Sequence, residues 1–325
     1  MIMSIIAFTE NWDGRFKKIS YELVSYAHQL AVQMNTTAIA LSIGKVQDEE
    51  LKKLGHYGAS KIIKVEDSRI DGLVNKAFAS IIAQVAEKEG ADVVVFSHNL
   101  TGKALAPRVA VRLKAGLASG VNALPDSLQP FVVKKGVFTG KAIGHITIKS
   151  PKKILTLFPN SVETKEADEK ATIEAFTPQL TDAYFTTKVV DVKKVTDKIL
   201  LTDAEVVVSG GRGMKGADRW APLEELATEL GAATACSRPV SDEGWRSHQE
   251  HVGQTGKIIA PNVYIALGIS GAIQHLGGVS ASKHIIAINT DKDAPIFEAA
   301  EYGIVGDVHQ ILPILVEKVK EAKKH

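Results

Sequence analysis

Short runs of valine, isoleucine, alanine and leucine alternate along most of the chain with longer segments whose apolar residues recur at helical spacing. Two such runs are TAIALSIG (37–44) and ADVVVFSH (91–98), and amphipathic segments at 18–34 and 73–88 lie between runs of this kind. A strand that is apolar at nearly every position is buried on both faces, which is typical of a parallel sheet covered by helices. The sequence therefore predicts an α/β fold.

The first half is expected to contain strands and helices in alternation. The predicted strands are SIIAFTE, TAIALSIG, KIIKVED and ADVVVFSH, and the predicted helices are Lys18 to Met34, EELKKLGHYGA, Leu73 to Lys88 and TGKALAPRVAVRL. From Phe131 three shorter β-like runs follow, punctuated by glycine and proline, and we expect them to extend or decorate this first domain: FVVKKGVFTG, KAIGHITIKS and KKILTLFP.

A chain of 325 residues is long enough for two domains, each with its own core. A charged, irregular segment precedes Val206, and we place the boundary near Thr196, giving an N-terminal α/β domain at 1–195 and a second domain at 196–325. The second half shows strands AEVVVSGG, AATAC, VYIALG, HIIAIN and GIVGD with helices between them and at the end. This pattern predicts a doubly wound parallel sheet, whose ligands bind outside the carboxyl ends of the strands.

Composition narrows the classes of partner. Lys plus Arg number 39 against 37 Asp plus Glu, and this balance of +2 gives no reason to expect nucleic acid or anionic lipid as a partner. Cys236 is the single cysteine, so a reducing compartment fits best. The first residues lack the basic region of a signal peptide, and no apolar run approaches the ~20 residues that span a bilayer. We expect a cytoplasmic protein without direct membrane insertion.

The stretch VVVSGGRGMKG (206–216) matches the G-x-G-x-x-G pattern at Gly211, Gly213 and Gly216, directly after a predicted strand. Glycine amides there can face phosphate oxygens, and the guanidinium of Arg212 can fork onto them. An NAD site also needs an acidic residue about 20 positions on. Ser237 and Arg238 stand there instead, which weakens NAD and leaves NADP open.

Other polar groups follow the remaining strands of the second half. Gln254 and Thr255 lie in a glycine-framed loop that lacks the spacing of a nucleotide-hydrolysing P-loop and suits a flat heterocycle. Ser270 opens a helix with small residues, which predicts a second anion site, and His275 falls one turn in, on the side that a bound ring could approach. Two further strand-end groups are of the type that read ribose or adenine: Asn289 and Asp307.

The run HQEH (248–251) brings two imidazoles and a carboxylate together. It is one residue short of the H-x-x-E-H zinc motif, and its spacing matches no common metal site. We therefore predict no metal.

Taken together, VVVSGGRGMKG, AATACSRPVSDEGW, VGQTGKIIAPNVYIALGISGAIQHLGG and IIAINTDKDAPIFEAAEYGIVGD closely resemble the C-terminal half of the α subunit of electron transfer flavoproteins, and GKALAPRVAVRL is similar to that family's first domain. The resemblance implies one FAD, held mostly by the second domain. It implies Arg212, Ser237 and Ser270 along the phosphates and ribityl chain, Asn289 and Asp307 at the adenosine, and Arg238, Gln254, Thr255 and His275 around the isoalloxazine ring. The same loops contribute the remaining expected FAD contacts: Val252, Gly253, Gly271, Ala272, Ile273 and Gln274.

The resemblance also implies an electron carrier rather than an enzyme with its own substrate. A β subunit, holding AMP or a second FAD in bifurcating versions, would complete the protein, and the N-terminal domain would supply subunit contacts. Electrons would arrive from acyl-CoA dehydrogenases of fatty acid β-oxidation and leave to a membrane quinone reductase. A reduced flavin gains negative charge near N1, so His275 and Arg238 would stabilise it as cation or donor while Thr255 bonds N5.

Two other readings stay open at this stage. The sequences IIAINTD and GIVGD are similar to the middle domain of thiamine-diphosphate enzymes. The chain lacks the G-D-G site of those enzymes. The hypothesis that remains is a non-catalytic, regulatory binder of adenine nucleotides. The other reading is an NADP-dependent reductase in which Arg238 contacts the 2′-phosphate.

Overall fold

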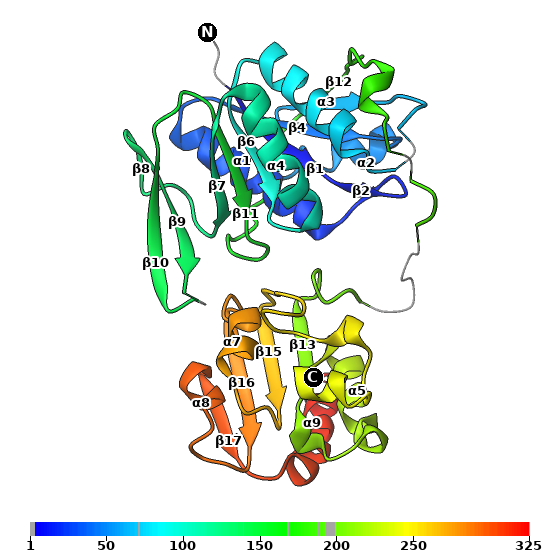
Figure 1. Cartoon of the computed structure of the whole chain (residues 1–325), viewed down its shortest axis with the longest axis vertical. Helices are drawn as coiled ribbons and strands as arrows, with labels where there is room; N and C mark the ends of the chain where they lie inside the picture. Colours follow the sequence, from blue (N-terminus) through cyan, green and yellow to red (C-terminus); the bar gives the residue numbers. More distant parts are fainter. Residues whose placement is uncertain are drawn as a thin grey trace. The chain divides into compact units, whose positions relative to one another are not determined.

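A computed structural model describes residues 4–70, 72–138, 140–167, 169–187, 189–192 and 199–324. The chain forms two compact units, one comprising Met1–Val137 and Ile143–Lys193, the other Phe138–Ala142 and Lys194–His325. Each unit has its own sheet (Figure 1). The domain boundary expected near Thr196 lies outside the described residues.

The first unit is built on a ten-stranded sheet. In spatial order, the neighbouring strands from Gly116–Val121 to Thr172–Ala175 all pair in parallel, whereas Phe131–Val137 pairs antiparallel with Gly116–Val121 and with Ser127–Leu128. In spatial order they are β10 (Ala142–Ile148), β9 (Phe131–Val137), β7 (Gly116–Val121), β11 (Lys153–Leu157), β6 (Ala91–Ser97), β1 (Ser4–Thr9), β4 (Thr37–Ile43), β5 (Lys61–Val65) and β12 (Thr172–Ala175), with β8 (Ser127–Leu128) on β9; a separate pair is β2 (Asn11–Trp12) and β3 (Arg15–Phe16).

The central strands of this sheet are buried on both faces, which explains why they are apolar at nearly every position. Ile5 belongs to one core together with Leu23 of α1, while the next residue, Ile6, belongs to the opposite core with Ile82 of α3 and Leu105 of α4. The helices of this unit are α1 (Lys18–Gln33), α2 (Asp48–Lys52), α3 (Asn75–Lys88) and α4 (Leu100–Leu113), with a 3₁₀ turn η1 (Asp182–Tyr184).

The structure corrects three expectations for the first unit. KKILTLFP does not decorate the sheet, because β11 lies inside it and pairs in parallel with both β6 and β7. The strands β7 and β12 were not predicted: β7 is rich in glycine and small residues, and β12 is a short edge strand with no buried residue. The helix expected over residues 49–59 ends early, since α2 gives way to consecutive turns after Lys52.

The second unit confirms the doubly wound prediction. Its five strands are all parallel, in the order β14 (Ala233–Cys236), β13 (Val206–Gly210), β15 (Val263–Leu267), β16 (His284–Asn289) and β17 (Tyr302–Val305). The chain runs from β13 to β14 on one side and then returns to β15 on the other. The carboxyl ends of β13 and β15 therefore flank a topological switch point, where such folds bind their ligands.

Helices cover both faces of the second sheet. Leu223 of α5 and Leu312 of α9 lie in one apolar core, and Val279 of α7 and Ile296 of α8 lie in the other. The helical elements are α5 (Ala221–Leu230), α6 (Arg238–Asp242), α7 (Ile273–Val279), α8 (Ile296–Ala299) and α9 (Val308–Ala322), with 3₁₀ turns η2 (Arg212–Met214), η3 (Ala217–Arg219) and η4 (His248–Glu250). In the described part of the chain, every helix is too short or too polar to cross a membrane.

Candidate functional site

The glycine-rich turn after β13 is packed directly against the turn after β15. The Gly211 N–H donates to the Leu267 carbonyl at 2.8 Å, and the Gly213 N–H donates to the Gly268 carbonyl at 3.0 Å. A Cβ on Gly213 would lie 2.6 Å from the Gly268 Cα, so only glycine allows this approach. This corrects the expectation that these two amides face phosphate. The side chain of Arg212, between these two glycines, is exposed.

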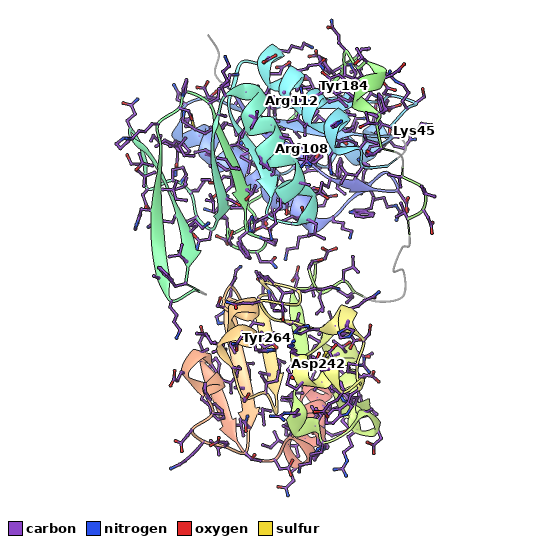
Figure 2. All side chains as sticks on the ribbon, in the orientation of Figure 1. Lys45, Arg108, Arg112, Tyr184, Asp242 and Tyr264 are labelled. Atoms are coloured by element: carbon purple, nitrogen blue, oxygen red, sulfur yellow. The ribbon has the colours of Figure 1, made fainter. Side chains whose placement is uncertain are left out.

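Ser237 and Arg238 follow β14 at the same edge of the sheet. Ser237 is buried at 7% exposure, and its N–H donates to the Gly210 carbonyl at 3.1 Å, which fixes the start of α6 beside β13. Arg238 is exposed, and its Nε donates to the Asp242 Oδ2 at 3.3 Å (Asp242 is labelled in Figure 2). The Arg238 charge is thus held at the carboxyl edge, next to β13, by an exposed ion pair.

The turn that carries Gln254 and Thr255 is docked onto α7. The Gln254 N–H donates to the Gln274 carbonyl at 2.8 Å, and a Cβ on Gly278 would lie 2.4 Å from the Gly253 Cα. Both Gln254 and Thr255 have exposed side chains. A rigid turn therefore presents two short polar groups, as the sequence predicted for a flat heterocycle.

The loop from β15 into α7 presents most of its predicted residues to solvent. Gly271 has a φ of +84°, and a Cβ there would lie 2.3 Å from the Ile296 N, so the loop depends on glycine. Among the predicted contacts in this region, Val252 and Gly271 are buried, while the exposed ones are Ser270, Ala272, Ile273 and Gln274.

His275 lies on the buried side of α7, which corrects the expectation that its ring is open to a ligand. It is 7% exposed, and its Nε2 lies 2.8 Å from the hydroxyl of Tyr264. Burial lowers the pKa of His275 to about 4, and the neighbouring His251 adds to this effect. The imidazole is therefore neutral near pH 7, so it can serve as a hydrogen-bond donor but not as a fixed cation. A hydrogen bond to the Val252 backbone acts in the opposite direction, but its effect on the pKa is smaller.

Asn289 and Asp307 both lie at the carboxyl edge and both have structural partners. Asn289 Nδ2 donates to the Ile269 carbonyl at 2.9 Å, tying together the loops after β15 and β16. Asp307 caps α9, accepting from the His309 N–H at 3.0 Å, and pairs with Lys215 Nζ at 3.0 Å. Both contacts hold the pKa of the Asp307 carboxyl below its ordinary value, and the hydrogen bond from the His309 backbone has the larger effect.

Sequence reasoning missed a cluster around Arg246. Its Nε and Nη2 donate to the two carboxylate oxygens of Glu250 at 2.7 and 3.1 Å, and its Nη1 donates to Glu224 at 2.6 Å. The guanidinium also lies 4.9 Å from the ring centre of Trp220. The cluster fastens the segment before the Gly253 turn to α5. In the sequence, this cluster is indicated only by the alternating charges around Arg246 and Glu250. Glu224 and Trp220, the other members, are distant in sequence.

The two histidines and the glutamate of HQEH do not form one cluster, because each contacts a different partner. Glu250 is engaged by Arg246, whereas His248 Nδ1 lies 2.7 Å from the Ser241 hydroxyl. The ring of His251 packs where a side chain on Gly256 would otherwise stand. Across the described ranges, no group of three or more His, Cys, Asp or Glu side chains is placed to hold a metal ion.

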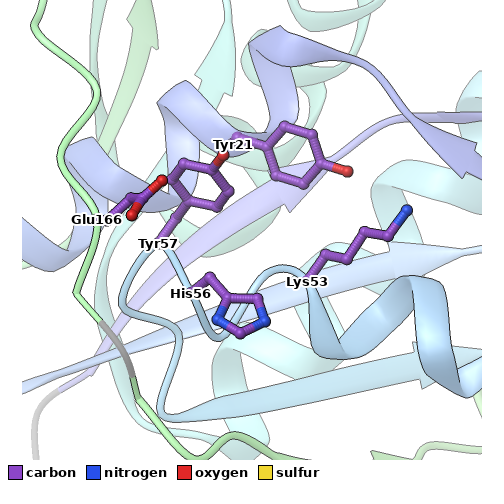
Figure 3. A pocket seen from close by; sticks show the side chains of 5 residues that line it. All are labelled: Tyr21, Lys53, His56, Tyr57 and Glu166. Carbon is purple, nitrogen blue, oxygen red and sulfur yellow. The ribbon is translucent and has the colours of Figure 1, made fainter.

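A pocket of about 510 Å³ in the first unit is a second place to consider (Figure 3). The rings of Tyr21 and Tyr57 stack there with centroids 4.8 Å apart. Lys53 Nζ is paired with Glu50 at 2.6 Å, and the Tyr21 hydroxyl lies 3.4 Å from the same carboxylate. Because Lys53 and Tyr21 are already engaged by Glu50, the carboxyl edge of the second sheet is the stronger candidate site. The remaining lining residues are His56 and Glu166.

The carboxyl edge of the second unit fits a flavin dinucleotide. The side chains of Arg212 and Arg238 are exposed beside the switch point, and Gln254, Thr255 and Ser270 add neutral donors and acceptors. Anionic phosphates match the two guanidinium groups, and the hydroxyl and amide groups match the heteroatoms of a ring system.

Comparison with known proteins covers both units. Residues 5–181 match a family model described as the electron transfer flavoprotein domain, and residues 200–280 match the electron transfer flavoprotein FAD-binding domain. The electron transfer flavoprotein subunit alpha of Bacillus subtilis (strain 168) is 36% identical over 323 residues, covering 99% of this chain and 98% of that protein. That of Megasphaera elsdenii is 36% identical over 327 residues, covering 98% and 97%.

A third relative carries a different name. The acryloyl-CoA reductase electron transfer subunit beta of Anaerotignum propionicum is 31% identical over 352 residues, covering 98% of this chain and 96% of that protein. The matches confirm the resemblance read from the sequence and confirm FAD as the cofactor. The chain belongs to the electron transfer flavoprotein α-subunit family, and its second unit carries that family's FAD-binding domain.

Proposed function

We propose that this chain is the FAD-binding subunit of a heterodimeric electron carrier that accepts electrons from dehydrogenases and passes them to a quinone reductase of the respiratory chain. The observation that carries the proposal is the full-length match of both units to electron transfer flavoprotein α subunits, together with the switch-point edge in the FAD-binding unit. Bound FAD supplies the uptake and release of electrons.

The chain's own residues hold and orient that cofactor. Arg212, Ser237 and Ser270 lie at the carboxyl edge as partners for the phosphates and the ribityl chain, and Asn289 and Asp307 complete the edge at the adenosine end. The isoalloxazine ring is placed beside four side chains: Arg238, Gln254, Thr255 and His275. Arg238 supplies positive charge where negative charge accumulates on reduction, and Thr255 supplies a hydroxyl for N5. The other expected contacts line the same loops: Val252, Gly253, Gly271, Ala272, Ile273 and Gln274.

A β subunit is the proposed partner of this chain, with contacts supplied by the N-terminal unit. The division at residues 195 and 196 between a subunit-contact domain and an FAD domain is part of this proposal. The donors are acyl-CoA dehydrogenases of fatty acid β-oxidation, and the site of action is the cytoplasm, in keeping with the single buried thiol of Cys236.

A second candidate for the electron partner follows from one relative. The Anaerotignum propionicum protein is named as a subunit of acryloyl-CoA reductase. In that version the carrier delivers electrons to an enzyme that reduces an unsaturated acyl-CoA, instead of receiving them from an acyl-CoA oxidation.

Anaerobic mixing tests the proposal and separates the two directions. The chain, copurified with its partner subunit, is mixed with a catalytic amount of an acyl-CoA dehydrogenase and its saturated acyl-CoA, and the flavin absorption is followed. Bleaching by the acyl-CoA, followed by recovery on adding a quinone reductase and quinone, is expected. Recovery only with an unsaturated acyl-CoA and its reductase would support the second candidate. Bleaching by NADPH alone would contradict both.

A further inference from the structure

Helix α4 of the first unit has apolar side chains on its outer side as well as on the side that packs on the sheet. Leu105 and Val109 are 0% exposed and belong to the core. On the outer side, Leu100 is 87% exposed and Val111 is 80% exposed. These two belong to a line of four residues at helical spacing, which we name the α4 stripe: Leu100, Ala104, Pro107 and Val111.

Basic side chains flank the α4 stripe on both sides. At 3.6 residues per turn, Lys103 falls on one side of the stripe, and Arg108 and Arg112 fall on the other. Arg108 donates to the Ala104 carbonyl of its own helix, and the Arg112 guanidinium lies 5.4 Å from the ring centre of Tyr184 (both arginines and Tyr184 are labelled in Figure 2). Within the ranges that the structure describes, no carboxylate forms an ion pair with these three cations.

Later segments of the chain pack on the two other long helices of this unit. On α1, the Lys165 N–H donates to the Ser25 hydroxyl at 2.8 Å. On α3, the Gln179 N–H donates to the Gln84 side chain at 2.8 Å. The α4 stripe stays exposed, so α4 keeps an apolar surface that the described chain leaves uncovered.

The stripe and its flanks define the chemistry of what covers them. An apolar centre with a charged rim is the anatomy of a protein interface, and apolar residues spaced by four, three and four positions form a seam against which another helix packs. The cations of the rim call for Asp or Glu beside the apolar residues of that helix. Side chains as large and as exposed as Leu100 and Val111 suit a permanent subunit contact better than a transient electron donor.

We propose that the α4 stripe is the docking surface for a helix of the partner subunit, whose apolar seam is flanked by Asp and Glu side chains. The inference rests on the proposed function for the existence of that subunit, and it adds the surface that receives it. Leu100 and Val111 supply the apolar area that is buried, while Lys103, Arg108 and Arg112 select the acidic rim.

Thiol labelling tests the burial of the stripe. Val111→Cys is labelled with a maleimide in the full chain alone and in the complex with its partner subunit. The native thiol of Cys236 is 0% exposed and adds no fast signal. We expect labelling of Val111→Cys to slow by at least about tenfold in the complex. Val32→Cys is the matched control, because Val32 of α1 is 67% exposed, and its labelling rate should not change.

Charge reversal tests the rim. Arg108→Glu should weaken association of the two subunits by at least about tenfold, because like charges then face each other across the interface. Lys45→Glu reverses an exposed charge of the same unit in the loop after β4 and should leave the association constant unchanged. If the chain alone does not stay folded, the labelling rates of the two cysteine variants within the complex are compared instead.

The outcomes separate this inference from the proposed function. A yellow complex in which Val111→Cys is labelled as fast as Val32→Cys would overturn the docking surface and leave the proposed function intact. Protection of Val111→Cys in the chain alone that grows with its concentration would overturn it in favour of a second copy. Protection only by phosphatidylserine vesicles would overturn it in favour of a lipid surface. A chain that neither associates with the partner subunit nor binds FAD would contradict the proposed function, and the inference would fall with it.

Discussion

Arg212 follows the first strand of the FAD-binding unit with an exposed side chain, between two glycines whose amides are already bonded to the neighbouring loop. We therefore propose that, within this turn, the Arg212 guanidinium binds the phosphates of FAD. Arg212→Ala should weaken FAD binding by roughly 10- to 150-fold, the worth of a charged hydrogen bond of about 1.5–3 kcal/mol. Fluorescence titration of the apoprotein measures this. Arg108→Ala, an exposed arginine of the first unit, is the control, and equal affinities would remove Arg212 from the site.

We propose that Arg238 acts on the potential of the flavin rather than on its retention. Its charge is offset by Asp242 at 3.3 Å in a solvated ion pair, and a flavin that gains negative charge competes for it. Arg238→Ala should lower the midpoint potential by the equivalent of about 1.5–3 kcal/mol. Asp242→Asn is the matched variant and should not lower it. A potential that stays the same in Arg238→Ala would contradict this role.

The buried His275 makes the second unit sensitive to acid. Its pKa is about 4 in the folded chain against 6.5 for a free histidine, so the unfolded chain binds a proton that the folded chain does not as the pH falls from 6.5 to 4. The free energy of unfolding should fall across this window by up to about 1.4 kcal/mol per pH unit and lose this dependence above it.

Urea titrations at pH 7 and pH 5 in a Trp12→Phe background would measure that acid dependence. The remaining tryptophans, Trp220 and Trp245, lie in the second unit and report its unfolding. His275→Gln should show a smaller loss between the two pH values. The same loss with and without His275 would contradict the assignment.

At the scale of elements, the site depends on loops that interlock through glycine. Gly278→Ala would place a methyl group 2.4 Å from the Gly253 Cα, so the turn carrying Gln254 and Thr255 must move off α7. We expect FAD affinity to fall at least tenfold and the melting temperature of the second unit to decrease. Gly136→Ala, where a Cβ meets no atom within 4 Å, should change neither. Unaltered FAD binding in Gly278→Ala would show that the turn is not part of the site.

The elements themselves could largely be predicted from sequence, whereas their contacts could not. Apolar runs such as that of β13 and helical spacing such as that of α1 are local signals. Strand β7 gave no such signal, because two glycines and small residues make it a strand only through its neighbours. The roles of Gly213 and His275 depend on what packs beside them: the Gly268 turn in one case and Tyr264 in the other. Periodicity within a segment does not encode these partners.

At the scale of the whole molecule, the chain has two units with separate cores, and we propose a different role for each: subunit contacts for the first and FAD binding for the second. The first unit has apolar cores on both faces of its central strands and a pocket in which Lys53 and Tyr21 contact Glu50. The second unit gathers the exposed cations and the glycine-locked turns at one sheet edge. This edge is where we propose that FAD binds.

The central claim is that the second unit binds one FAD per chain at its carboxyl edge. The most direct measurement is the visible spectrum of the protein copurified with its partner subunit, followed by denaturation, chromatographic identification of the released flavin and its molar ratio to this chain. We predict a yellow protein that releases FAD. The Arg212→Ala variant should contain one FAD fewer per chain, whereas Arg108→Ala should keep the full FAD content. A colourless protein that binds adenine nucleotides or NADP would contradict FAD binding at this edge. So would an Arg212→Ala variant with the same flavin content as the unmodified protein.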